Sequence, residues 1–185
     1  MDVSSSDLLL GITEFSIGLA GFSGIVAALA HRTGSWVQVD RYRIGNLLFS
    51  GLSPGFLAFI ALGLLANFEL QVNVWKFSSG LLALVLGYGT FVTIYGRRKL
   101  PQNERKLISI RVFSAQRAIS LVALAFQLLS ILGMFPDYIF SIFYFGLIAQ
   151  LFVATVQFTR IIFVRPKTNE PLVDPVFGSA VEEQD

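Results

Sequence analysis

Residues 8–30 read LLLGITEFSIGLAGFSGIVAALA, an apolar run that contains a single charged side chain, Glu14. A helix of about 20 apolar residues is long enough to cross the roughly 30 Å hydrocarbon core of a bilayer. Four further runs of this kind follow, near 44–68, 75–96, 115–135 and 138–163. All five should be helical, because lipid offers no hydrogen-bond partners to an open strand edge. The sequence therefore predicts an all-α membrane protein, a bundle of about five transmembrane helices.

Composition supports this class and excludes several others. Only 14% of the residues are charged and 54% are hydrophobic, whereas a soluble domain usually carries about 25% charged residues. The chain has no cysteine and one histidine, His31, so a thiolate or multi-histidine metal site is excluded. No phosphate loop, dinucleotide fingerprint or pair of catalytic groups is present. We therefore expect no cofactor, no metal, no nucleic-acid partner and no enzymatic activity.

The distribution of Lys and Arg predicts the orientation. Thirteen of the 14 positive residues lie in the loops after the first and third spans or near and beyond the end of the fifth; Lys76 is the exception. Segments rich in Lys and Arg remain on the cytoplasmic side. The prediction is an N-terminus outside and a cytoplasmic C-terminus, with a transmembrane domain over 1–164 and a flexible cytoplasmic tail over 165–185.

Two alternatives to this topology can be weighed from the sequence. Ala28-Leu29-Ala30 resembles a signal-peptidase site, but residues 1–7 lack the positive charge of a signal peptide and the apolar run is too long. The last two runs could form a re-entrant hairpin, but each is long enough for a full crossing.

The first span has one unusual face. Residues on it recur at spacings of three and four, which places them on one side of a helix: Asp7, Gly11, Glu14, Gly18, Gly21, Ile25 and Ala28. A carboxylate at membrane depth costs about 2.5–3.5 kcal/mol. Three interpretations remain open: an acidic ring around an oligomer axis, an ion or proton relay inside one protomer, or a small face that packs closely against another helix.

The second span is interrupted near mid-membrane. Pro54 removes a backbone donor and predicts a kink, which Gly51 and Gly55 should loosen further. Broken helices at this depth often lie beside a site or gate, so Ser53 and Pro54 are candidates for one. The segment also matches Gly-x-Ser-x-Gly, but that nucleophile motif needs a strand-to-helix turn and a nearby histidine base.

Glutamines mark the last two spans. Gln127 should lie at nearly the depth of Glu14 and is the expected partner of that carboxylate. Gln150 and Gln157 share one face of the fifth span with Gly146 and Arg160. Such amides either bond across helices or line a path for a solute. The candidate pore or relay residues are Glu14, Gly18, Gly21, Ser53, Pro54, Gln127, Gln150 and Gln157.

The longest inner loop is basic. Its side chains could contact anionic lipid headgroups or could simply set the topology. The headgroup candidates are Arg97, Arg98, Lys99, Arg105 and Lys106.

One stretch resembles other proteins. GFSGIVAAL at 21–29, followed by Ser35-Trp36 and by DRYR at 40–43, is similar to a group of small bacterial inner-membrane proteins. Those proteins have a Gly-Phe-Ala-Gly-like first span and a Trp and an Asp-Arg pair in the first loop. The resemblance is limited to the N-terminal part of the chain, from the first span through the first loop. It implies a multi-pass location in the bacterial cytoplasmic (inner) membrane, without implying an activity.

These features favour an oligomeric membrane channel or transporter for an ion or small solute. Glu14 would form an acidic outer entrance that attracts a cation, and copies of the chain and the lipid bilayer would be the partners. The alternative is a non-transporting membrane subunit or scaffold that works through its basic cytoplasmic loop and tail.

Overall fold

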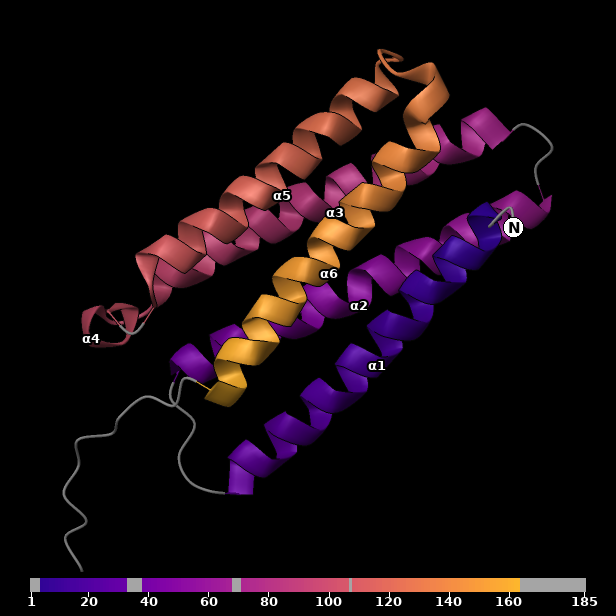
Figure 1. Cartoon of the computed structure of the whole chain (residues 1–185). Coiled ribbons are helices and arrows are strands. Elements are labelled where there is room, and N and C mark those ends of the chain that lie inside the picture. Colours follow the sequence, from indigo (N-terminus) through magenta and orange to yellow (C-terminus); the bar gives the residue numbers. More distant parts are fainter. Residues whose placement is uncertain (1–3, 33–37, 68–70, 107, 164–185) are drawn as a thin grey trace, which may run out of the picture.

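In a computed structural model the described residues of the chain form five long helices and two short ones (Figure 1). The structure describes residues 4–32, 38–67, 71–106 and 108–163, with only the backbone described for 29–32. The helices are α1 (Ser5–Arg32), α2 (Gln38–Asn67), α3 (Gln71–Lys99), α4 (Gln102–Arg105), α5 (Ile110–Ile131), the 3-10 turn η1 (Pro136–Tyr138) and α6 (Ile139–Phe163).

The predicted all-helical class is confirmed for the described residues, and so is the expectation of five helices of membrane-spanning length. Five helices are long and apolar enough to cross a membrane, as judged by length and composition. α5 has 22 residues and α6 has 25, which at 1.5 Å per residue gives about 33 and 38 Å. These are the lengths of full crossings rather than of a re-entrant hairpin.

The turn between α5 and α6 follows from its sequence. Gly133 has φ +81°, a conformation that glycine adopts without steric cost. Its N–H donates to Ser130 O and the N–H of Met134 donates to Leu129 O, which is the Schellman pattern that ends a helix. Pro136 then opens η1 and directs the chain into α6.

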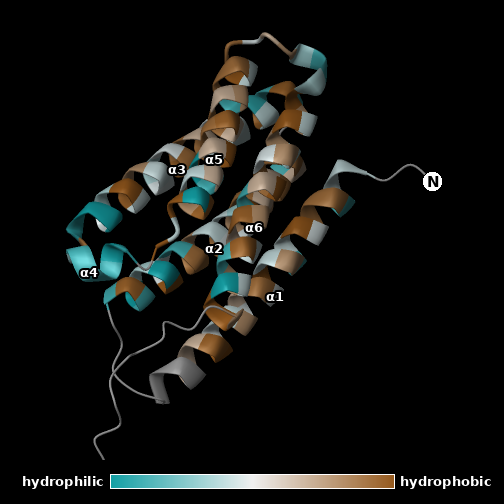
Figure 2. Ribbon diagram, turned by 60° about the vertical axis from the view of Figure 1, so that its left-hand side comes forward, coloured by the Kyte–Doolittle hydropathy of each residue, from teal (hydrophilic) through white to brown (hydrophobic). Residues whose placement is uncertain are grey.

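Helices α2, α3, α5 and α6 pack around one another, and α1 lies at the edge against α2 with a smaller contact to α6 (Figure 1). The centre is an apolar cluster that includes Leu57, Leu82, Phe143 and Leu147. Large apolar side chains such as Phe59 and Phe145 are exposed on the outside. Figure 2 shows the long helices mostly brown and pale, as expected for a surface that faces lipid.

The contact between α1 and α2 depends on the glycines beside Pro54. A Cβ on Gly55 would lie 2.6 Å from Ser16 Cβ, and one on Gly51 would lie 3.5 Å from Leu19 Cδ2. α2 continues as one helix through Pro54, which is fully buried. Gly51 and Gly55 therefore let two helices approach closely, a role different from the expected loosening of the helix.

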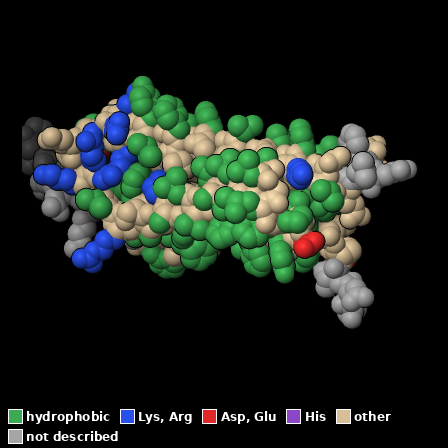
Figure 3. All heavy atoms as spheres, turned by 90° about the horizontal axis from the view of Figure 1, so that it is seen from above, with side chains coloured by type: hydrophobic (Ala, Val, Ile, Leu, Met, Phe, Trp, Pro, Cys, Tyr) green, Lys and Arg blue, Asp and Glu red, His purple; other side chains and the backbone are tan. Residues whose placement is uncertain are grey.

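Basic residues gather at one end of the molecule (Figure 3). We call it the basic end: there α1, α3 and α6 end and α2 and α5 begin, with α4 between α3 and α5. Glu104 of α4 accepts a hydrogen bond of 2.8 Å from the N–H of Val39, so its carboxylate caps the first turn of α2. That the basic end faces the cytoplasm remains a prediction, and the predicted tail over 165–185 lies outside the described residues.

Candidate functional site

The face of α1 that carries Glu14 points away from the rest of the chain. Glu14, Gly18 and Gly21 are all exposed, and a Cβ on either glycine would meet nothing within 4 Å. The opposite face packs on α2 through Leu9, Ser16 and Leu19 and is buried. Within the described residues this excludes a relay inside one protomer and excludes packing of this face on a helix of the same chain. Packing on a helix of a second copy and an acidic ring around an oligomer axis both stay predictions.

Gln127 has a partner other than the expected one. It is fully buried between α5 and α6, where its Nε2 donates to Ile142 O at 2.9 Å. A Cβ on Gly146 would lie 2.5 Å from that same nitrogen, so the glycine makes room for the amide. The expected pairing of Gln127 with Glu14 was wrong, because α1 packs on α2 and α6 and not on the Gln127 face of α5.

Ser53 and Gln150 meet in the middle of the bundle. Gln150 Nε2 donates to Ser53 Oγ at 2.7 Å, and that hydroxyl in turn donates to Phe49 O in its own helix. Gln150 is buried, and its Oε1 has no hydrogen-bond partner among the described residues. The sequence marked both residues, and the structure joins them across α2 and α6 beside Pro54.

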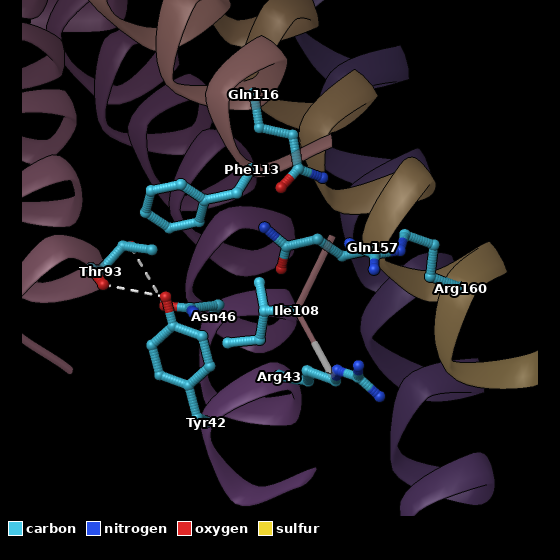
Figure 4. A pocket seen from close by; sticks show the side chains of 9 residues that line it. All are labelled: Tyr42, Arg43, Asn46, Thr93, Ile108, Phe113, Gln116, Gln157 and Arg160. Atoms are coloured by element: carbon cyan, nitrogen blue, oxygen red, sulfur yellow. Dashed lines mark hydrogen bonds between the residues drawn. The ribbon is translucent and has the colours of Figure 1, made fainter. Parts of the chain in front are cut away.

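Two turns further along α6 lies a polar pocket at the basic end (Figure 4). Four helices and the segment before α5 form it. It is lined by Tyr42, Arg43, Asn46, Thr93, Ile108, Phe113, Gln116, Gln157 and Arg160. In Figure 4 the amides of Gln116 and Gln157 point into the pocket, with Arg43 and Arg160 along one side of it. Gln116 Nε2 and Gln157 Oε1 have no partner among the described residues.

The other wall of the pocket is held by hydrogen bonds. Tyr42 Oη donates to Thr93 O at 2.8 Å, and Thr93 Oγ1 lies 3.2 Å from Asn46 Oδ1 (Figure 4). Gly96 allows the Tyr42 ring to lie against α3, since a Cβ there would be 2.9 Å from the ring. This wall is therefore fixed by α2 and α3, while the amides and Arg160 come from α5 and α6.

Part of the basic loop supports the pocket rather than facing lipid. The Arg97 guanidinium lies 4.6 Å from the centre of the Phe113 ring, and that of Arg117 lies 5.5 Å from it, which are cation–π contacts. Arg105 donates to the carbonyls of Arg98 and Leu100 at 2.7 and 3.2 Å. Of the five headgroup candidates, Arg98, Lys99 and Lys106 have exposed side chains.

No family model, curated protein or solved structure matches the chain. The resemblance of its N-terminal part to small bacterial inner-membrane proteins stays a prediction. The described residues contain no group of three metal-ligating side chains.

Of the nine lining residues the sequence marked only Gln157 as a site candidate. Four uncharged polar residues are among those it missed: Tyr42, Asn46, Thr93 and Gln116. A signal existed for one of them. Gln116 precedes Gln127 on the same face of α5, and the buried residues of that helix are Gln116, Ala123, Gln127 and Ser130. The other three resemble the ordinary polar residues of a membrane interface, and only the packing of α2 on α3 brings them together.

Proposed function

We propose that the protein passes a small ion or solute across the membrane through the interior of the α2, α3, α5 and α6 bundle. One observation carries the proposal: Ser53 and buried Gln150 are hydrogen-bonded to each other deeper in the bundle than the polar pocket at the basic end. The helix from Gln150 to Gln157 rises by about 10.5 Å. Polar side chains therefore lie at the basic end and again in the middle of the bundle, with buried Ala154 of α6 between the two levels.

The amides of this interior are incompletely satisfied by the protein. Gln116, Gln150 and Gln157 each have a buried atom without a partner among the described residues. Leaving such an atom unpaired costs about 1–3 kcal/mol. Residues that served only to pack the helices together would not need to carry this cost. A hydrated ion or polar solute in the bundle would supply the missing hydrogen bonds.

Apolar side chains close the interior of the bundle on the side of Ser53 that is away from the basic end. There the apolar cluster around Leu57, Phe143 and Leu147 fills the bundle. Passage requires this cluster to part, and the backbone beside Pro54, which lacks one helical hydrogen bond, is the place where α2 can bend. The Pro54 segment thus remains the candidate gate.

Cysteine labelling tests the pathway, because the chain has no cysteine of its own. Gln150→Cys is compared with Phe152→Cys, whose side chain is exposed on the outside of α6. Silver ion, a thiol-reactive cation small enough for the pocket, is applied to the basic end. It should modify Gln150→Cys and leave Phe152→Cys unmodified, since only a hydrated thiolate reacts. Equal reactivity of the two variants would refute the pathway and favour the non-transporting subunit that acts through its basic loop.

A second candidate feature concerns assembly. Glu14 is exposed on α1 at about 13 Å from the first residue of that helix, where lipid is a costly neighbour for a carboxylate. A second copy of the chain seated on Glu14, Gly18 and Gly21 would cover it. This favours the expected homo-oligomer, in which Glu14 would lie between copies and not on the path through the bundle interior.

A further inference from the structure

The pocket at the basic end carries an excess of positive charge. Arg43 of α2 and Arg160 of α6 both line it, and the charge of Arg160 acts on Arg43. None of the nine lining residues is acidic. Arg43 also faces a carboxylate outside this lining, since its Nη1 lies 3.9 Å from Asp40 Oδ1. Two arginines along one side of a pocket repel each other, and an anion bound between them relieves that repulsion.

The pocket also offers one unused donor and one unused acceptor. Gln116 is 7% exposed and its Nε2 has no partner among the described residues. Gln157 Oε1 lacks a partner there as well. A bare oxyanion such as sulfate can accept from the arginines and from Gln116, but it has no hydrogen to give to Gln157.

The volume limits the size of the ligand. The cavity measures about 40 Å³. One water needs roughly 10–15 Å³ on this measure, so the cavity holds about three waters or one group of similar size. A single tetrahedral oxyanion fits this description, and a larger organic solute does not fit as a whole.

We propose that this pocket binds a phosphate group that also carries a hydroxyl. Arg43 and Arg160 hold the charged oxygens, Gln116 donates to a third oxygen, and the hydroxyl of the ligand donates to Gln157 Oε1. Hydrogen phosphate has such a hydroxyl on phosphorus, and the headgroup of phosphatidylglycerol has one on its glycerol. This inference deepens the proposed function by naming the ligand of the same pocket, but it does not require that the ligand crosses the membrane.

Binding is measured first with inorganic phosphate, on the full chain in an uncharged detergent at constant ionic strength. Phosphate should raise the unfolding temperature and sulfate should do so much less. Arg43→Gln and Arg160→Gln should each weaken phosphate binding about ten-fold or more, because each removes a charge-assisted hydrogen bond. Arg41→Gln and Arg111→Gln are the matched controls, since both are exposed basic residues of the same end that do not line the pocket.

A second variant tests the preference for phosphate over sulfate, a comparison within one protein that a general loss of stability would not change. Gln157→Leu leaves both arginines in place and should bring phosphate and sulfate to similar affinity, because it removes the acceptor that distinguishes them. An unchanged preference for phosphate in this variant would overturn the role of the ligand hydroxyl.

The source of the phosphate group is separated by lipid composition. The same variants are compared in nanodiscs of phosphatidylcholine with and without phosphatidylglycerol. Binding of free phosphate without anionic lipid identifies a free ion, and stabilisation only by phosphatidylglycerol identifies a headgroup; both results support the pocket. The proposal is overturned if neither ligand stabilises the protein, or if the two control variants lose as much affinity as the pocket variants.

The outcome can differ from that of the cysteine labelling. Phosphate binding that depends on Arg43 and Arg160, together with an unreactive Gln150→Cys, would establish the ligand and refute passage. A reactive Gln150→Cys without phosphate binding would support passage through the bundle and refute the phosphate site.

Discussion

Helices α1 and α6 both carry polar residues at membrane depth, and the fold treats them in opposite ways. Gln150 of α6 is buried and bonded to Ser53 of α2. Glu14 of α1 is exposed on the outer face of a helix that packs mainly on α2. In the first case the chain itself provides a partner for the amide nitrogen, and in the second it leaves the carboxylate to something outside the protomer.

Glycines show the same contrast. Gly55 and Gly146 lie where another residue occupies the space of a side chain, whereas Gly18 and Gly21 face open space. In lipid, close approach of small residues is a main source of helix association. Gly51 and Gly55 of α2 and Gly146 of α6 thus have their contacts within the chain, and Gly18 and Gly21 of α1 are the ones that a second copy would use.

The largest effect should come from filling the contact between α1 and α2. Gly55→Leu places a side chain where Ser16 Cβ lies 2.6 Å from the new Cβ, and overpacking of this kind costs about 1–3 kcal/mol. The free energy of unfolding in mixed micelles should fall by that amount. Gly63→Leu is the matched control on the same helix, because nothing lies within 4 Å of its Cβ; an equal loss in the control would show that α2 tolerates no added bulk anywhere.

A smaller effect should come from breaking the polar pair in the bundle. Gln150→Leu and Ser53→Ala each remove the 2.7 Å hydrogen bond between them. A double-mutant cycle should give a coupling of about 0.6 kcal/mol, and at most about 1.7 kcal/mol. The same cycle between Ser53→Ala and Phe152→Leu should give no coupling, because Phe152 is exposed on the outside of α6. A coupling near zero for the first pair would mean that the bond contributes nothing to the packing of α2 on α6.

The spans were predictable because lipid imposes a simple length rule on apolar runs. The predicted runs 75–96 and 138–163 lie within or close to α3 (Gln71–Lys99) and α6 (Ile139–Phe163). The prediction was poorest at the basic end, where α2 begins at Gln38, well before the predicted run that starts at position 44. Hydropathy detects the segment in hydrocarbon, and Arg41 and Arg43 lie on turns of the helix beyond that segment.

The site was less predictable, for a different reason. Gln150 and Gln157 are conspicuous as polar residues in an apolar run, so the sequence alone marked them. Their partners depend on how each helix is rotated and which helices are neighbours. Equal depth made Gln127 the expected partner of Glu14, but depth does not say that α5 lies beside α6 and not beside α1.

The smallest effect on stability, and the sharpest test of the contrast, should come from Gly18→Leu. Its Cβ would meet nothing within 4 Å in the protomer, so the free energy of unfolding should change by less than about 0.5 kcal/mol. If a second copy packs on this face, the added side chain separates the helices, and the native mass should fall to that of one chain. Gly45→Leu is the control, since it too is exposed with open space around it, but on α2. A native mass that stays oligomeric in Gly18→Leu would place the contact between copies elsewhere and leave Glu14 facing lipid.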